Sequence, residues 1–183
     1  EKALKKLEQN GELARQLDDI ERDREETRKR IRRHEDAIKA IADGEMVVVV
    51  DDDDRENEGD LIAAAAKITP EQMALMVRHG TGIVCLPITA EDAKRLKLDP
   101  MVALNDAPMG TAFTVSIDYK DGLTTGISAR ERTATAHALA NRNVAAEDFV
   151  RPGHMFPLVA KSGGVLMRSG HTEAAVDLVK LAG

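Results

Sequence analysis

Met46-Val47-Val48-Val49-Val50 decides the fold, because a short run of β-branched residues predicts a strand that is buried on both faces. A strand of this kind belongs to a sheet that helices cover. Helical segments follow along the chain, and Thr69, Thr89 and Ser128 stand where helix N-caps are expected. Strands interspersed with helices indicate an α/β fold over residues 44–183, with helices packed on a mixed β-sheet.

The other elements are predicted from hydrophobic periodicity and from turn residues. The alternation of apolar and polar residues over 113–118 is typical of a half-buried strand. The predicted helices cover residues 70–79, 90–98, 129–140 and 172–182, and the further predicted strands cover 82–88, 113–118, 155–160 and 165–168.

Residues 1–43 have a different texture and predict a long, charged helical extension before the α/β domain. Apart from Asn10-Gly11, which can break or cap a helix, they contain no Gly or Pro. One stripe recurs at helical spacing but is polar at Arg24, Thr27 and His34, which makes a poor coiled-coil seam. Two interpretations stay open: a solvated helix supported by acid–base pairs, or an arm that binds a partner.

Composition excludes several classes of function. The 183 residues suffice for one domain with a sizeable core, and 43% of them are hydrophobic. A net charge of −6 argues against nucleic-acid binding, because phosphate backbones require a basic face. No apolar run approaches the roughly 18–20 residues that span a bilayer, and the charged first residues are unlike a signal peptide. The single cysteine, Cys85, fits a reducing cytoplasm.

The acidic segment Asp51-Asp52-Asp53-Asp54-Arg55-Glu56-Asn57-Glu58-Gly59-Asp60 directly follows the predicted strand. It has a formal charge of −6 within ten residues. Apolar residues on both sides anchor it, and a loop at a strand end is a common position for a site in α/β proteins. Crowded carboxylates repel one another unless a cation compensates them, and oxygen ligands favour a hard ion such as Mg²⁺. A metal site and a solvated acidic loop are the two interpretations.

A basic, glycine-containing stretch runs from Arg151 to Thr172, with three basic residues and no acid. Gly170 frees the backbone there, and the N-terminal amides of a helix beginning at Thr172 are suited to an anion. Arg168 has a planar guanidinium that suits a phosphate. The alternative is a set of glycine-rich turns with ordinary surface arginines.

The two regions together suit a phosphorylated sugar. The basic stretch would bind the phosphate, and the acidic segment would hold a metal ion that polarises carbonyl and hydroxyl oxygens. Histidines and carboxylates would move the protons. Composition and spacing therefore indicate metal-assisted chemistry on a sugar phosphate.

Six segments also resemble, in order, the successive motifs of the 3,4-dihydroxy-2-butanone 4-phosphate synthase family. The resemblance covers residues 37–183 and implies an α/β homodimer that uses Mg²⁺, with Mn²⁺ as the alternative. It also implies the conversion of D-ribulose 5-phosphate to 3,4-dihydroxy-2-butanone 4-phosphate and formate in riboflavin biosynthesis. The segments are DDDDRENEGD, GIVCLPIT, GTAFTVSID, DGLTTGISARERT, RPGHMFPL and RSGHTEAAVDL.

The resemblance also implies roles for individual residues. Glu56 and His171 match metal ligands. His154, Glu58 and Asp60 match residues that act in catalysis. Contacts with the substrate are expected from Arg55, Glu56, Asp60 and Thr125, and from the phosphate loop Arg168, Ser169, Gly170, His171 and Thr172.

The chain departs from the family pattern at both ends. The family normally continues past Gly183 with a strand that carries a catalytic glutamate, so the usual C-terminal segment is expected to be lacking. The charged helix exceeds the usual leader. The alternative function is therefore a truncated or catalytically silent homologue that acts as a binding or assembly module. Cys85 lies where the family has a cysteine near the site, but its apolar neighbours favour a buried structural thiol.

Overall fold

The computed structural model describes the backbone of residues 2–183 and the side chains of residues 11–183. The chain divides into two compact units between Ala37 and Ile38. Helix α1 (Lys2–Asp43) forms the first unit, and its last turn belongs to the second. Across the described residues, no helix combines the length and the apolar character that crossing a bilayer would require.

In the first unit, α1 is a charged and exposed helix. Asn10-Gly11 does not interrupt it, although glycine favours the unfolded chain. Ion pairs join Arg22 to Asp19 at 2.8 Å and Arg32 to Glu25 at 3.9 Å. Such exposed pairs contribute about 0–1 kcal/mol each, so they support the helix without indicating a partner. That residues 1–43 act as a separate extension stays a prediction.

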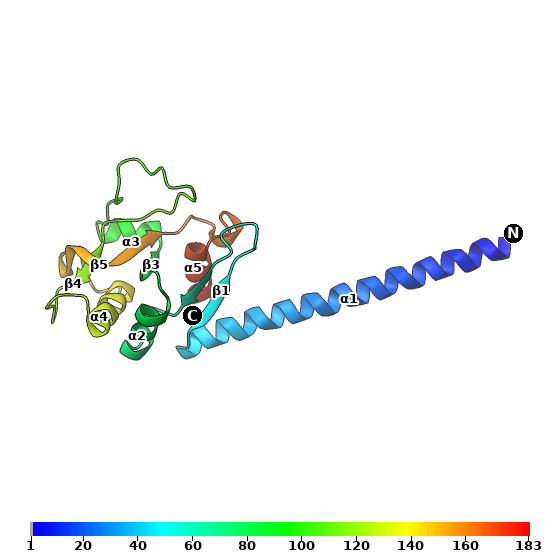
Figure 1. Ribbon diagram of the computed structural model, residues 1–183, viewed down its shortest axis with the longest axis horizontal. Coiled ribbons are helices and arrows are strands. Elements are labelled where there is room, and N and C mark those ends of the chain that lie inside the picture. Colours follow the sequence, from blue (N-terminus) through cyan, green and yellow to red (C-terminus); the bar gives the residue numbers. More distant parts are fainter. Residues whose placement is uncertain (1) are drawn as a thin grey trace. The chain divides into compact units, whose positions relative to one another are not determined.

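The second unit contains a three-stranded sheet of β3 (Cys85–Ile88), β4 (Ile117–Tyr119) and β5 (Phe149–Val159), in the order β3-β5-β4 (Figure 1). β3 is parallel to β5 and β4 is antiparallel to it. Ile117 and Met155, which pair across the β4–β5 ladder, are both fully buried. The predicted fold class, α/β with a mixed sheet, is confirmed.

Helices α2 (Pro70–His79) and α4 (Ala129–Ala140) pack against each other (Figure 1). Thr69 and Ser128 cap them, as predicted, and each forms a reciprocal capping box with the residue three positions later. Each box satisfies two backbone N–H groups that the helix itself leaves without partners. These helix starts follow from local sequence alone.

Helix α3 (Ala90–Arg95) begins at the predicted cap, Thr89, but ends earlier than predicted. Lys97 adopts a left-handed backbone, φ +51°, which cannot continue an α-helix. A 3-10 turn, η1 (Ala146–Asp148), leads into β5, and α5 (His171–Ala182) packs against β3 near the end of the chain.

Burial of the first strand on both faces was a wrong prediction. Among the residues that the structure describes, β1 (Val47–Val50) pairs only with β2 (Gly59–Ile62), in an antiparallel two-stranded sheet. Val48 and Val50 are 65% and 71% exposed, whereas the alternate side chains pack on a cluster that contains Ile41. An antiparallel pair can bury one face and leave the other open, and the number of partner strands is not encoded in the run of valines itself.

The strand predicted over 165–168 is also wrong, because the chain forms a 3-10 turn there, η2 (Gly164–Leu166). Gly163 and Gly164 both have positive φ, +93° and +63°, and reverse the chain before a strand can form. A side chain on Gly164 would overlap the carboxylate of Asp177. The two glycines therefore fix a compact turn in front of α5.

The strand predicted over 113–118 is only partly formed. β4 begins at Ile117, and Phe113 makes an isolated bridge with Leu158 instead of joining a continuous ladder. Thr114 still donates its backbone N–H to the carbonyl of Pro157 at 3.0 Å. The segment therefore follows β5 as an irregular edge.

Candidate metal and substrate site

The acidic segment is an ordered loop between β1 and β2, and Asp51 closes it. The Asp51 carboxylate accepts the backbone N–H of Glu58 at 2.9 Å and that of Glu56 at 3.2 Å. Burial opposes the charge of Asp51, but these backbone hydrogen bonds and the Arg55 guanidinium hold its pKa below the ordinary value. Asp51 is therefore ionised at neutral pH and organises the loop.

Arg55 lies between two carboxylates of this loop. Its Nη1 is 2.6 Å from Asp51 Oδ2 and 2.6 Å from Glu56 Oε2. This single base draws two acids together in a segment that would otherwise be self-repelling. Glu58 is exposed and is held through its backbone, and Asp60 lies at the start of β2.

His171, the first residue of α5, lies against the acidic loop. One side-chain ligand atom from each of Asp51, Glu56 and His171 falls within 4.8 Å of the other two. The His171 side chain is only 11% exposed, and its Nδ1 is 3.9 Å from Asp60 Oδ2, which is too far for a hydrogen bond. Its Nε2 is buried without a hydrogen-bond partner among the described residues. A buried polar nitrogen without a partner is costly, so these three side chains fit a bound cation.

The segment predicted to bind phosphate, residues 168–172, is held in place by the buried Glu173. Arg168 donates to Glu173 Oε2 at 2.7 Å, and Glu173 is 1% exposed. The other Glu173 oxygen accepts the backbone N–H of Lys161 at 2.8 Å. Arg168 also reaches Thr111 Oγ1 at 3.3 Å, so its guanidinium is held in one direction by several contacts.

The remaining phosphate-loop residues surround the start of α5. Gly170 is the N-cap, with an extended backbone, and its position leaves no room for a side chain beside the Arg168 guanidinium. Thr172 is buried in the first turn, and Ser169 is exposed. Backbone N–H groups at a helix start attract anions, so the predicted phosphate position and the His171 ring share one helix terminus.

His154 belongs to a different cluster. Its Nδ1 lies 2.7 Å from Asp118 Oδ2, and Arg132 donates to its backbone carbonyl at 3.0 Å. Thr125 is exposed in the loop next to this pair, and Glu131 holds that loop by accepting the backbone N–H of Thr124 at 2.7 Å. Hydrogen bonds from the side chain and backbone of Thr124, from the Ser128 side chain and from the Gly126 backbone lower the pKa of Glu131 far below its ordinary value.

A pocket of about 240 Å³ lies beside His154, and its wall also contains Arg132, Val77, Ile83 and Phe156. No hydrogen bond or ion pair of the described residues joins this cluster to the Asp51–Glu56–His171 cluster. The structure thus brings together the predicted metal ligands, and it places His154 and Thr125 in a second group. Sequence reasoning missed Asp51 as a third candidate ligand and Asp118 as the partner of His154.

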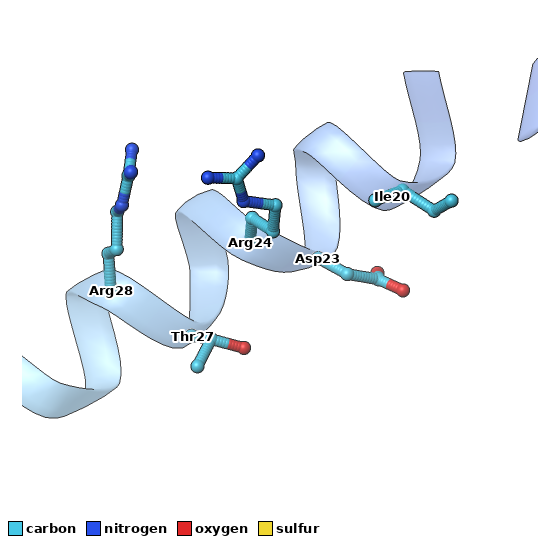
Figure 2. Close-up of a pocket in the computed structure, with 5 residues that line it drawn as sticks. All are labelled: Ile20, Asp23, Arg24, Thr27 and Arg28. Carbon is cyan, nitrogen blue, oxygen red and sulfur yellow. The ribbon is translucent and has the colours of Figure 1, made fainter. Parts of the chain in front are cut away.

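A larger hollow, of about 360 Å³, lies on α1 and has the character of a helix surface. Figure 2 shows Arg24 and Arg28 pointing to one side of the helix, and Asp23 and Thr27 pointing to the other. Ile20 completes the lining. All five lining residues belong to this one exposed helix, and we assign no function to them.

Cys85 should react slowly with alkylating agents. Burial, with a smaller contribution from the carboxylate of Asp60, raises the pKa of its thiol to about 11. Only the thiolate reacts, so alkylation by iodoacetamide at pH 8 should be about a hundredfold slower than for an ordinary thiol. The rate should rise about tenfold per pH unit up to about pH 11. The same chain unfolded in urea is the control, and equal rates in the two states would contradict the buried thiol.

The comparisons with known proteins agree with this arrangement. The family model of 3,4-dihydroxy-2-butanone 4-phosphate synthase matches residues 35–183. The 3,4-dihydroxy-2-butanone 4-phosphate synthase of Agrobacterium fabrum is 57% identical over 149 residues, which are 81% of this chain and 70% of that protein. The riboflavin biosynthesis protein RibBA of Nocardia farcinica is 58% identical over 149 residues, 81% of this chain and 36% of that protein. The chain thus spans about a third of the length of relatives of the RibBA type.

Solved structures give the same match. A crystal structure of 3,4-dihydroxy-2-butanone 4-phosphate synthase in complex with two magnesium ions has a TM-score of 0.79 and 52% identity. The match covers 81% of this chain and 69% of that one. RibBX from A. baumannii, a two-domain 3,4-dihydroxy-2-butanone 4-phosphate synthase, has a TM-score of 0.78 at 45% identity, over 82% of this chain and 44% of that one.

Proposed function

Because this chain belongs to the 3,4-dihydroxy-2-butanone 4-phosphate synthase family, we propose that it is a lyase of riboflavin biosynthesis that acts on D-ribulose 5-phosphate. The products are 3,4-dihydroxy-2-butanone 4-phosphate and formate, and the cofactor is Mg²⁺, with Mn²⁺ as the alternative. The observation that carries this proposal is the cluster of Asp51, Glu56 and His171, whose ligand atoms lie within 4.8 Å of one another.

The donor set of this cluster fits a divalent cation. Two carboxylates supply hard oxygen ligands, which Mg²⁺ and Mn²⁺ prefer. The buried Nε2 of His171 gains the partner that it otherwise lacks. When bound, the cation would supply Lewis-acid polarisation of neighbouring substrate oxygens. A magnesium complex of a structural relative supports this assignment.

The start of α5 suits the phosphate end of the substrate. The backbone N–H groups near Gly170 and Thr172 provide a region of positive potential. Arg168 lies beside them with its guanidinium already fixed by Glu173, so little side-chain entropy is lost when an anion binds. Ser169, exposed on the same turn, adds a hydroxyl donor.

His154 and the loop carboxylates Glu58 and Asp60 transfer the protons in this reaction. A proton must leave the substrate carbon next to the carbonyl to form an enediol, and a water leaves in the following step. After the carbon skeleton shifts, water returns and formate departs, so the atoms balance. A carboxylate and an imidazole are the side-chain groups that most often accept or donate such protons in enzymes.

The decisive experiment measures formate release from D-ribulose 5-phosphate in the presence of Mg²⁺. The chain is compared with the same chain extended by the C-terminal segment of a family member. Release that stops with EDTA and returns with Mg²⁺ supports the lyase. If neither form releases formate although both still bind the metal, the lyase proposal is wrong. The chain would then be a catalytically silent homologue that acts as a binding or assembly module.

We also propose a homodimer, in which the second unit provides the interface. The chain without residues 1–35 should still be a dimer, with a mass in light scattering that equals two copies of the shortened chain. The stripe of α1 is interrupted by polar residues and offers little continuous apolar burial, whereas the second unit exposes Ile83 by 58% and Val77 by 47%. A monomer after the deletion would instead identify α1 as the dimerisation arm. A cytoplasmic location stays a prediction, supported by the single cysteine.

A further inference from the structure

Asp118 has a buried carboxylate that contacts both the backbone N–H and the imidazole ring of His154. Its exposed fraction is 3%. Asp118 Oδ1 accepts the backbone N–H of His154 at 2.9 Å, and Oδ2 lies 2.7 Å from the ring nitrogen Nδ1. A buried carboxylate needs compensating donors, and here His154 supplies two of them.

A register shift between β4 and β5 creates this contact. Ile117 pairs with Met155, but the next residue, Asp118, pairs with Val150. The intervening part of β5 is therefore left out of the ladder and carries His154 across the Asp118 side chain. Gly153 permits the close approach, because a side chain there would overlap the backbone of Ile117.

The contact determines which ring nitrogen of His154 is free. An ionised carboxylate only accepts hydrogen bonds, so Nδ1 must carry the proton. In the neutral ring, Nε2 is then the basic nitrogen. Within the described part of the chain, no hydrogen bond uses Nε2, and His154 lines the pocket of about 240 Å³.

The loop over Thr124–Ser128 covers the Asp118–His154 contact. Gly126 lies directly over it: a side chain there would overlap Asp118 Oδ2 and come within 2.8 Å of His154 Nδ1. Its φ of +80° also favours glycine. Glu131 fixes the loop by accepting the Ser128 hydroxyl at 2.7 Å, in addition to its bonds from Thr124. The covered hydrogen bond is shielded from competing water, which strengthens it.

We propose that Asp118 is a positioning residue for the reaction, which holds the His154 ring in the Nδ1–H tautomer so that Nε2 faces the pocket as the proton acceptor. The role of His154 rests on the proposed function. The tautomer itself rests only on the geometry, and the two are therefore measured separately.

Asp118→Asn is the informative change, because the backbone fixes the orientation of the new amide. The N–H of His154 requires an oxygen at the Oδ1 position, so the amide NH₂ must face Nδ1. The NH₂ can only donate, and the ring must therefore shift to the Nε2–H tautomer. Nitrogen-15 NMR above the titration range of imidazole should show Nδ1–H in the wild type and Nε2–H in the variant, with His154→Gln used to assign the signals.

In the formate-release assay, Asp118→Asn should lower kcat by about a hundredfold or more, the usual contribution of a general base, and change KM less than threefold. Asp148→Asn is the matched control. Asp148 also accepts a backbone N–H, from Ala145 at 2.8 Å, but it lies outside the pocket lining, and its replacement should leave kcat and the His154 signals unchanged.

Several outcomes decide the inference. An Nε2–H tautomer in the wild type overturns it, and so does an unchanged tautomer or an unchanged kcat in Asp118→Asn. The wild-type spectrum alone decides the tautomer if the variant does not fold. If neither this chain nor its extended form releases formate, a tautomer reversal in Asp118→Asn still supports the control of the His154 ring by Asp118 and refutes only the proposed lyase function.

Discussion

Glu56→Gln is expected to reduce Mg²⁺-dependent formate release by about a hundred- to a thousandfold. The amide keeps the shape of the side chain but loses the charge that attracts a divalent cation, and carboxylates are much better ligands for Mg²⁺. Steady-state kinetics over a Mg²⁺ titration measures the loss. Calorimetric titration with Mn²⁺ should show weaker binding to the variant even in the absence of substrate.

The fold of this variant should survive. Glu56 makes one partly exposed ion pair with Arg55, and such a pair contributes about 0–1 kcal/mol. Arg55 keeps its bond to Asp51 at 2.6 Å. Asp54→Asn is the matched control, because it removes one charge from an exposed position of the same loop. Wild-type turnover by Glu56→Gln would remove this residue from the metal site.

Arg168→Ala should damage both stability and substrate binding, for separable reasons. Removing one partner of a buried ion pair typically costs about 3–5 kcal/mol, because the other charge stays buried. Glu173 keeps the Lys161 N–H, so we expect the lower end, about 3 kcal/mol. Urea unfolding measures this cost. The KM for D-ribulose 5-phosphate should rise at least about tenfold, since a charge-assisted contact to phosphate is lost.

The double variant Arg168→Ala/Glu173→Gln separates the two effects. A neutral amide is less costly to bury than an unpaired carboxylate, so most of the lost stability should return while the KM stays high. Arg130→Ala, at an exposed position of α4, is the control and should change neither quantity. A KM restored to the wild-type value in the double variant would show that Arg168 supports the fold but does not bind phosphate.

The parts of the fold that depend on neighbours in sequence were predictable. The Ser128 cap and the start of α2 depend on residues within one turn of the helix, and both are present. Exposure of Val48 depends on which strands and helices reach β1, and a run of valines carries no information about that. The glycine pair before Val165 has a left-handed geometry that continues a turn into the segment predicted as a strand.

In the candidate site, too, some residues could be predicted from the sequence and others could not. Motif resemblance supplied Glu56 and His171, which the structure brings together, although their metal-binding roles stay predictions. The sequence did not distinguish Asp51 from the six other acids of the segment. The contact between Asp118 and His154 joins residues 36 positions apart and depends on a shift in strand register. No local signal in the sequence indicates such a shift.

The order of strands in the three-stranded sheet determines when the Asp118–His154 contact can form during folding. β3 and β4 each lie beside β5, which comes later in sequence, so the sheet cannot assemble until β5 has been brought to both. Closing long loops slows folding, whereas helices with their own caps form from local contacts. α2 and α4 should therefore appear early, and the Asp118–His154 contact should appear only once β5 has paired. A chain in which β5 has not yet paired would have near-native helix content, but Asp118 would not yet orient the ring of His154.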